Sequence, residues 1–141
     1  RGSDVAGTAA DYRRESSVIV LLDTSTPVCV LTMVEGKAQR QVTWHADRSL
    51  AHGILSFLQQ NTGDIQHIRA IGVMRGPGSF TGLRIGLTVA NTIAAEQHIP
   101  IVGEVGAEWQ ARCLARLARG ETDHIVLPVY GADARITRPR K

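Results

Sequence analysis

The strongest constraint on the fold is an apolar run at 18–22, followed by two more strand-like segments after very short connections. The run is continuously apolar and ends at Asp23, which is typical of a buried strand. The next two segments, 28–34 and 38–44, are separated only by a turn at 35–37. Strands joined by such short connections pair antiparallel. The chain is therefore expected to begin with a three-stranded meander.

Helices and single strands alternate after the meander. The first expected helix runs from about 49 to 61 and is capped by Asp47 or Ser49. It is followed by a strand at 68–74, a helix at 83–97 and a short strand at 99–102. The last expected elements are a helix at 107–118 and an apolar segment at 125–130. This β-β-β-α-β-α-β-α order predicts an α/β fold with one mixed five-stranded sheet and flanking helices. It is the order of ribonuclease-H-like domains, here a single lobe of the kind found in the actin-like ATPase superfamily.

The length of 141 residues fits one domain. We expect a flexible lead-in at 1–17, the domain at 18–120, and a C-terminal strand with a basic tail at 121–141. The net charge of +3 comes from the tail, because residues 18–130 carry equal numbers of acidic and basic side chains. The tail bases are Arg135, Arg138, Arg140 and Lys141. They are expected either to touch RNA or an acidic partner or to be a solvated chain end.

Other features exclude several classes of protein. Aromatic residues make up only 4% of the chain, which argues against a base-stacking surface. Cys29 and Cys113 lie far apart and form no CxxC motif, so both are expected to be reduced, buried thiols. The five histidines form neither HxxxH nor HExxH, and no metal site is expected. No apolar run approaches the length of a membrane span and no signal-peptide pattern is present, so we expect a cytoplasmic protein without membrane contact.

A glycine-rich string at 75–86 lies between an expected strand and an expected helix. Its glycines permit positive φ and close backbone approach, and Ser79 or Thr81 can cap the helix. Such a helix start can bind an anion, but the string is not a P-loop because no Lys follows its last glycine. A structural turn is favoured over a phosphate site, and both stay open. The loop itself comprises Gly76, Pro77, Gly78, Ser79, Phe80, Thr81 and Gly82.

Here the sequence resembles a known family. The string GPGSFTGLRIG is similar to the signature of the TsaB family, also called YeaZ. The segments 23–26 and 99–103 resemble two further motifs of that family, and the Pro-x-Tyr at 128–130 resembles the start of its C-terminal tail. Family members usually have a second lobe between the third helix and that tail, where this chain has only 120–124. The usual His-Ser pair at the first helix appears here as Arg48-Ser49.

The resemblance implies a non-catalytic dimerisation and scaffold subunit of the complex that transfers an N6-threonylcarbamoyl group to the adenosine next to the anticodon of tRNA. It implies binding and activation of the catalytic TsaD subunit, an association with the TsaE ATPase, and a possible homodimer. Contact with tRNA would occur through the complex and the basic tail. ATP and metal would belong to the partner subunits, and no cofactor is expected in this chain.

The resemblance also implies that helices 49–61 and 83–97 form the partner interface. Small residues on the second helix would let another helix approach closely. The expected interface residues are Leu50, Ile54, Leu58, Leu83, Gly86, Leu87, Ala90 and Ala94. The alternative is that these residues form the intramolecular core.

We expect Ala90→Arg to leave the monomer folded and to stop association. If the face instead packs on the sheet, the change should unfold the domain.

The rival hypothesis is a small actin-like ATPase or kinase that uses the loop at 76–82 and the segment Asp23, Thr24, Ser25 and Thr26. In the wider superfamily an Asp at the end of the first strand positions a metal–phosphate group. The strand at 68–74 contributes no acid beside it, and a lone Asp before Thr-Ser-Thr is more often a turn residue. We therefore expect at most a vestigial phosphate site and no catalytic residue. A third hypothesis, an RNA-binding module that uses the tail, is disfavoured by the neutral body of the chain.

Overall fold

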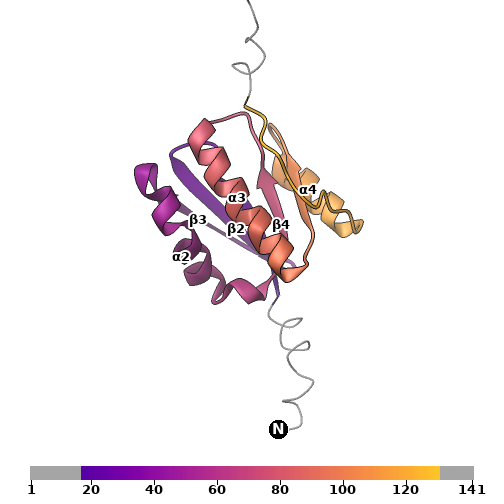
Figure 1. The fold of residues 1–141 in the computed structure, drawn as a ribbon. Helices are drawn as coiled ribbons and strands as arrows, with labels where there is room; N and C mark the ends of the chain where they lie inside the picture. Colours follow the sequence, from indigo (N-terminus) through magenta and orange to yellow (C-terminus); the bar gives the residue numbers. More distant parts are fainter. Residues whose placement is uncertain (1–16, 131–141) are drawn as a thin grey trace, which may run out of the picture.

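A computed structural model describes residues 17–130, which form one mixed sheet with helices on both faces (Figure 1). The strands are β1 (Val18–Asp23), β2 (Val28–Glu35), β3 (Ala38–His45), β4 (Ile68–Met74) and β5 (Ile101–Glu104). The helices are α2 (Leu50–Thr62), α3 (Phe80–Gln97) and α4 (Trp109–Ala118), with short 3-10 turns η1 (Asp47–Ser49) and η2 (Ile65–His67).

The sheet has the order β3-β2-β1-β4-β5. The first three strands pair antiparallel, with Leu21 opposite Thr32 and Leu31 opposite Val42. β4 then lies parallel to β1, and β5 lies parallel to β4. Both the predicted meander and the predicted crossovers are confirmed, and the fold is ribonuclease-H-like.

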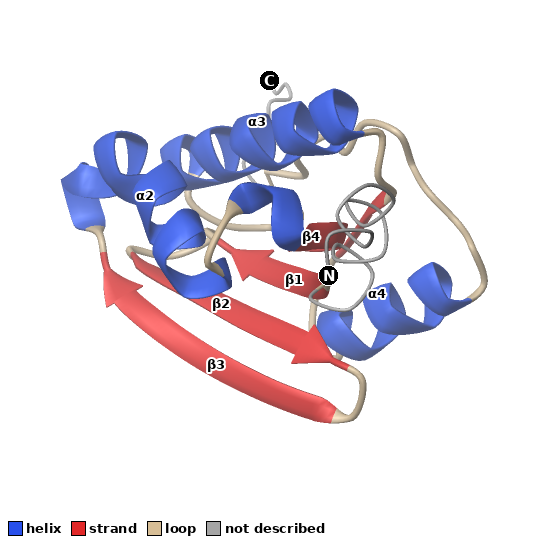
Figure 2. Ribbon diagram, turned by 90° about the horizontal axis from the view of Figure 1, so that it is seen from below, coloured by secondary structure: helices blue, strands red, loops and turns tan. Residues whose placement is uncertain are grey.

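The two faces of the sheet carry separate apolar clusters. α2 and α3 lie side by side over one face, and α4 covers part of the other (Figure 2). The larger cluster joins α2 and α3 to the sheet through side chains such as Ile54, Leu58 and Leu87. The smaller cluster packs Trp109 and Cys113 of α4 on Leu21 and Val102. Of the helices in 17–130, none is long and apolar enough to cross a membrane.

The predicted C-terminal strand is wrong. Residues 121–130 contain no strand and instead form an extended segment, here called the strap, beside β5. Side chains supply most of its hydrogen bonds, as when the Thr122 hydroxyl accepts from the backbone N–H of Ile101. The strap also belongs to the domain that we expected to end at 120, because Val126 is only 3% exposed within the larger core cluster. The lead-in up to residue 16 and the tail from 131 lie outside the described residues.

Candidate functional site

The two loops that could have formed a phosphate site pack directly on each other. The backbone N–H of Ser79 donates to the carbonyl of Ser25 at 2.8 Å. The buried hydroxyl of Thr24 donates to the carbonyl of Gly82, also at 2.8 Å. Ser79 caps α3, since its hydroxyl accepts from the backbone N–H of Gly82. The segment 23–26 and the loop 76–82 are thus brought together, although the sequence linked them only in the rival ATPase or kinase hypothesis.

Three glycines make this close approach possible. A Cβ at Gly78 would lie 2.5 Å from the Cβ of Ser25, and a Cβ at Gly86 would lie 2.7 Å from the Cγ2 of Thr24. A Cβ at Gly82 would overlap the carbonyl oxygen of Thr24. These separations are shorter than real side chains allow, so the glycines serve contact between the loops. The space directly between the loops is filled by the protein itself.

The Asp23 carboxylate is engaged in its own loop. One oxygen accepts from the backbone N–H of Ser25 at 2.9 Å and from the Ser25 hydroxyl at 2.6 Å. This is the local turn geometry that short polar side chains favour. Cys29 on the adjacent strand is buried, and burial together with the Asp23 charge raises its pKa to about 12. A thiol with so high a pKa is a poor nucleophile at neutral pH.

An open cleft of about 580 Å³ lies beside this loop pair. It lies where α2 and α3 begin, and Thr26, Arg48 and Thr81 are among the residues that line it. Among residues 17–130, the exposed Thr26 hydroxyl bonds only the backbone of Val28. No group of three or more potential metal ligands occurs within residues 17–130.

The structure corrects the surface assignment of the predicted interface residues. All eight are buried in the monomer, and Ala90 is 1% exposed. The list is Leu50, Ile54, Leu58, Leu83, Gly86, Leu87, Ala90 and Ala94. Most of these side chains belong to the larger core cluster, and Gly86 lies against Thr24. Buried in this way, the eight residues are not available to a partner in this structure. The periodicity correctly identified the apolar face of each helix, but that face covers the protein's own sheet.

A different apolar row lies on the outer side of the helix pair. Gly53 and Phe57 on one flank of α2 contact Trp44 of β3, which leaves Ala51 and Leu55 on the opposite flank, toward α3. On α3, Asn91 on one flank bonds the strap, and the opposite flank, toward α2, carries Ile85 and Val89.

Ala51 is exposed, Leu55 is 48% exposed, and Ile85 and Val89 are half-buried. We call these four residues the helix seam. Sequence reasoning missed them, although the four-residue spacing within each pair was a visible signal.

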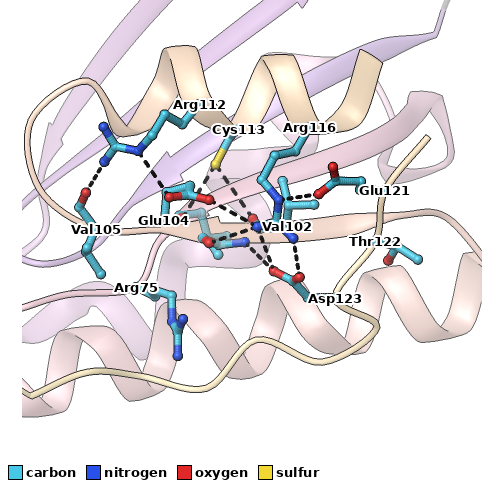
Figure 3. Close-up of polar contacts among 12 residues, drawn as sticks. Arg75, Val102, Glu104, Val105, Arg112, Cys113, Arg116, Glu121, Thr122 and Asp123 are labelled. Atoms are coloured by element: carbon cyan, nitrogen blue, oxygen red, sulfur yellow. Dashed lines mark hydrogen bonds and ion pairs between the residues drawn. The ribbon is translucent and has the colours of Figure 1, made fainter. Parts of the chain in front are cut away.

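The strap is held by a cluster of charges around Arg116 of α4 (Figure 3). The Arg116 guanidinium forms ion pairs with Glu104, Glu121 and Asp123. Asp123 also accepts from the backbone N–H of Gly103 at 2.9 Å. Burial alone would raise the pKa of Asp123, but the hydrogen bonds from Arg116 and Gly103 outweigh it and lower that pKa. The same ion pairs raise the pKa of Arg116.

Further along, the strap is fixed by polar side chains of the body. The Asn91 amide group donates to the carbonyl of Val126 and accepts from its backbone N–H, each at 2.9 Å. The Arg75 side chain donates to the carbonyl of Leu127, and the backbone carbonyl of Arg75 accepts from the N–H of Val129. The Phe80 and Tyr130 rings contact each other, with centroids 4.6 Å apart. The strap therefore ties α4, β5 and α3 to the glycine-rich loop.

Known proteins match the part of the chain that forms this helix pair. A family model described as "TsaD: tRNA N6-adenosine threonylcarbamoyltransferase" matches residues 41–114, more than half of the chain. The relative named tRNA threonylcarbamoyladenosine biosynthesis protein TsaB from Haemophilus influenzae is 28% identical over 92 residues, and the TsaB of Escherichia coli is 30% identical over 90. The chain belongs to this TsaD-type family, among its TsaB (YeaZ) members.

A solved TsaB-type structure has the same fold. YeaZ from Pseudomonas aeruginosa matches with a TM-score of 0.54 and 27% identity, and the match covers 74% of this chain and 50% of that one. The two TsaB relatives are matched over 62% and 60% of this chain but only 39% and 38% of their own length. The chain thus spans well under half of the curated relatives.

Proposed function

We propose that this chain is a non-catalytic scaffold subunit in the synthesis of threonylcarbamoyladenosine in tRNA. In this role it binds a catalytic TsaD subunit and activates it, and it makes no bonds itself. The observation that carries the proposal is the helix seam, an apolar row that lies within the stretch matched by the family model. Apolar side chains gathered on an outer face are typical of a protein interface.

The geometry of the seam supports helix-to-helix docking. Ala51 and Leu55 are separated by one helical turn, as are Ile85 and Val89, so each pair lies on one side of its helix. Ile85 and Val89 also pack against the larger core cluster, which fixes their positions. Partner helices bind such rows with apolar residues spaced three and four apart. Docking would leave undisturbed the eight core residues beneath the seam.

The state of the loops supports a non-catalytic role. The Asp23 carboxylate accepts hydrogen bonds from Ser25, and the buried Thr24 hydroxyl donates to the carbonyl of Gly82. These groups therefore stabilise the loop contact. The proposal assigns ATP and metal to partner subunits. It also includes a TsaE ATPase as a further partner, a possible homodimer through the same seam, and contact of the basic tail with tRNA in the assembled complex. The proposed location is the cytoplasm, which suits the two buried free thiols.

The seam can be tested with matched variants of α2. Leu55→Arg places a charge in the seam, and Ser56→Arg places the same charge on the exposed flank away from α3. The unchanged chain and Ser56→Arg should co-elute with a TsaD homologue on size exclusion, and Leu55→Arg should not. A buried unpaired charge costs several kcal/mol, enough to abolish a micromolar contact. Circular dichroism should show all three proteins folded. Co-elution of Leu55→Arg, or loss of binding in Ser56→Arg alone, would contradict the assignment.

A further inference from the structure

Exposed apolar side chains gather at a second place, around the strap. Six large apolar residues are exposed in the described chain, and Leu55 of the seam is one of them. The other five lie on the strap or on the two loops beside it. With Tyr130, which contacts Phe80, they form what we call the strap patch: Phe80, Val105, Ile125, Leu127, Val129 and Tyr130.

The extended backbone of the strap explains why its apolar residues divide between inside and outside. Successive side chains of an extended segment point to opposite sides. Val126 points into the core, and Ile125 and Leu127 on either side of it are 65% and 64% exposed. Val129 is exposed as well, two positions further on. The outer row thus repeats every second residue, which fits an extended partner segment with the same alternation.

The charge of the patch indicates what else such a segment would carry. Val105, Ile125 and Leu127 line a cleft of about 470 Å³ together with Arg75. The acids of the same cleft, Glu104 and Asp123, are already in ion pairs with Arg112 or Arg116.

Arg75, in contrast, has no carboxylate within ion-pair distance among residues 17–130; its side chain donates only to the carbonyl of Leu127. Arg84 lies over the Phe80 ring, 5.3 Å from its centroid, and adds a second exposed positive charge. The Arg75 charge also acts on Asp123 and helps to lower the pKa of that carboxyl. The apolar patch is therefore bordered by two arginines that form no ion pair within residues 17–130.

We propose that the strap patch docks an extended segment of a partner protein in which large apolar residues alternate with carboxylates. The apolar side chains would lie along Ile125, Leu127 and Val129, and a carboxylate would reach the Arg75 guanidinium, which can bind it through two N–H groups. RNA fits the patch less well. Its outer row is aliphatic rather than aromatic, and the Phe80 ring is already in contact with Tyr130 and Arg84.

The test is a titration of the isotope-labelled chain, followed by backbone amide NMR shifts. The probes are a short peptide that alternates leucine and glutamate, a peptide in which lysine replaces glutamate, and oligouridine. The glutamate peptide should shift the amides of Ile125, Leu127 and Val129 saturably, and the lysine peptide should bind at least about tenfold more weakly because it meets like charge. Equal binding of both peptides, no saturable shift with the glutamate peptide, or shifts with oligouridine alone would overturn the proposal.

Two variants connect the binding to the patch. Ile125→Ser with Leu127→Ser removes two exposed side chains and should abolish the peptide shifts while the thermal unfolding curve stays within a few degrees. Leu55→Ser removes an exposed leucine from the helix seam and should leave peptide binding unchanged. Unchanged binding in the double variant, or lost binding in Leu55→Ser, would also overturn it. Since TsaD binding is assigned to the seam, the double variant should still co-elute with TsaD.

Discussion

At the scale of single residues, a close contact joins Gly86 of α3 to Thr24, the residue that follows β1. The Thr24 side chain is buried, and its methyl carbon lies where a side chain at position 86 would have to go. Position 86 therefore requires a glycine, although a glycine inside a helix normally lowers helix stability by about 1 kcal/mol relative to alanine. The cost is offset because α3 can approach the end of β1 closely enough for the Thr24 hydroxyl to reach Gly82.

Gly86→Ala should consequently destabilise the protein, although alanine is the better helix former. We expect a loss of about 1–3 kcal/mol in the free energy of unfolding, typical of overpacking. Thr88→Ala, at an exposed position of the same helix, should change it by less than about 0.5 kcal/mol. Urea unfolding followed by circular dichroism measures both. A Gly86→Ala protein as stable as the unchanged chain would show that the loop contact is looser than described.

At Ala90, the buried environment reverses the mutational effect that we expected from the sequence. Because it is buried against the sheet, Ala90→Arg should unfold the domain rather than produce a folded monomer that has lost its partner. An arginine there would lie in the apolar core without an acidic partner, at a cost of several kcal/mol. Thr92→Arg is the control, because Thr92 is exposed on the same helix, and it should unfold at the same temperature as the unchanged chain. A cooperatively folded Ala90→Arg protein would contradict the packing of α3.

At the scale of elements, the strap is held mainly by polar contacts, with Val126 as its one fully buried apolar anchor. Segments with few buried apolar contacts open more readily than the core. The hydrogen bonds of Asn91, Thr122 and Asp123 replace the ladder that a sixth strand would form. Opening of the strap should therefore depend on side-chain chemistry.

That dependence predicts a pH response. The pKa of Asp123 is lowered in the folded chain, so its contribution to stability is present above the unfolded value of about 4 and is lost as pH falls through the folded pKa. Hydrogen exchange at the Val126 amide should stay well protected near pH 5 and lose its protection below about pH 4. Asp123→Asn should be less protected at pH 5 and show a smaller acid-dependent step. A part of the step should remain, because hydrogen bonds from Arg116 and Arg119 also lower the pKa of Glu121 on the strap. Protection that is the same in both proteins at every pH would contradict the role of Asp123.

At the scale of the whole molecule, much of the architecture could be predicted from local patterns. The apolar run at 18–22 and the short turn at 35–37 identified the meander, and the glycine-rich string was correctly placed between β4 and α3. The exception is the strap. Its partners are remote, with Asn91 and Val126 separated by 35 positions and Arg75 and Leu127 by 52, and no periodicity records such contacts.

The candidate site was harder to predict for a related reason. A helical pattern shows which residues share an apolar face, but it does not show whether a sheet or another protein covers that face. Ile54 and Leu58 turned out to face inward, and the exposed Leu55, an apolar position of the same helix, was not among the expected interface residues. Two loops that could have enclosed a phosphate instead pack on each other, which depends on distances that no sequence spacing fixes.

The role proposed for this chain is to promote tRNA modification through TsaD and not by chemistry of its own. The most direct measurement is threonylcarbamoyladenosine formed in tRNA, quantified by mass spectrometry, with a TsaD homologue and its substrates in the presence and absence of this chain. We predict no product and no ATP turnover with the chain alone, and more product when the chain is added to TsaD. Turnover by the chain alone that disappears in Asp23→Ala, or no gain in product on adding it, would contradict this role.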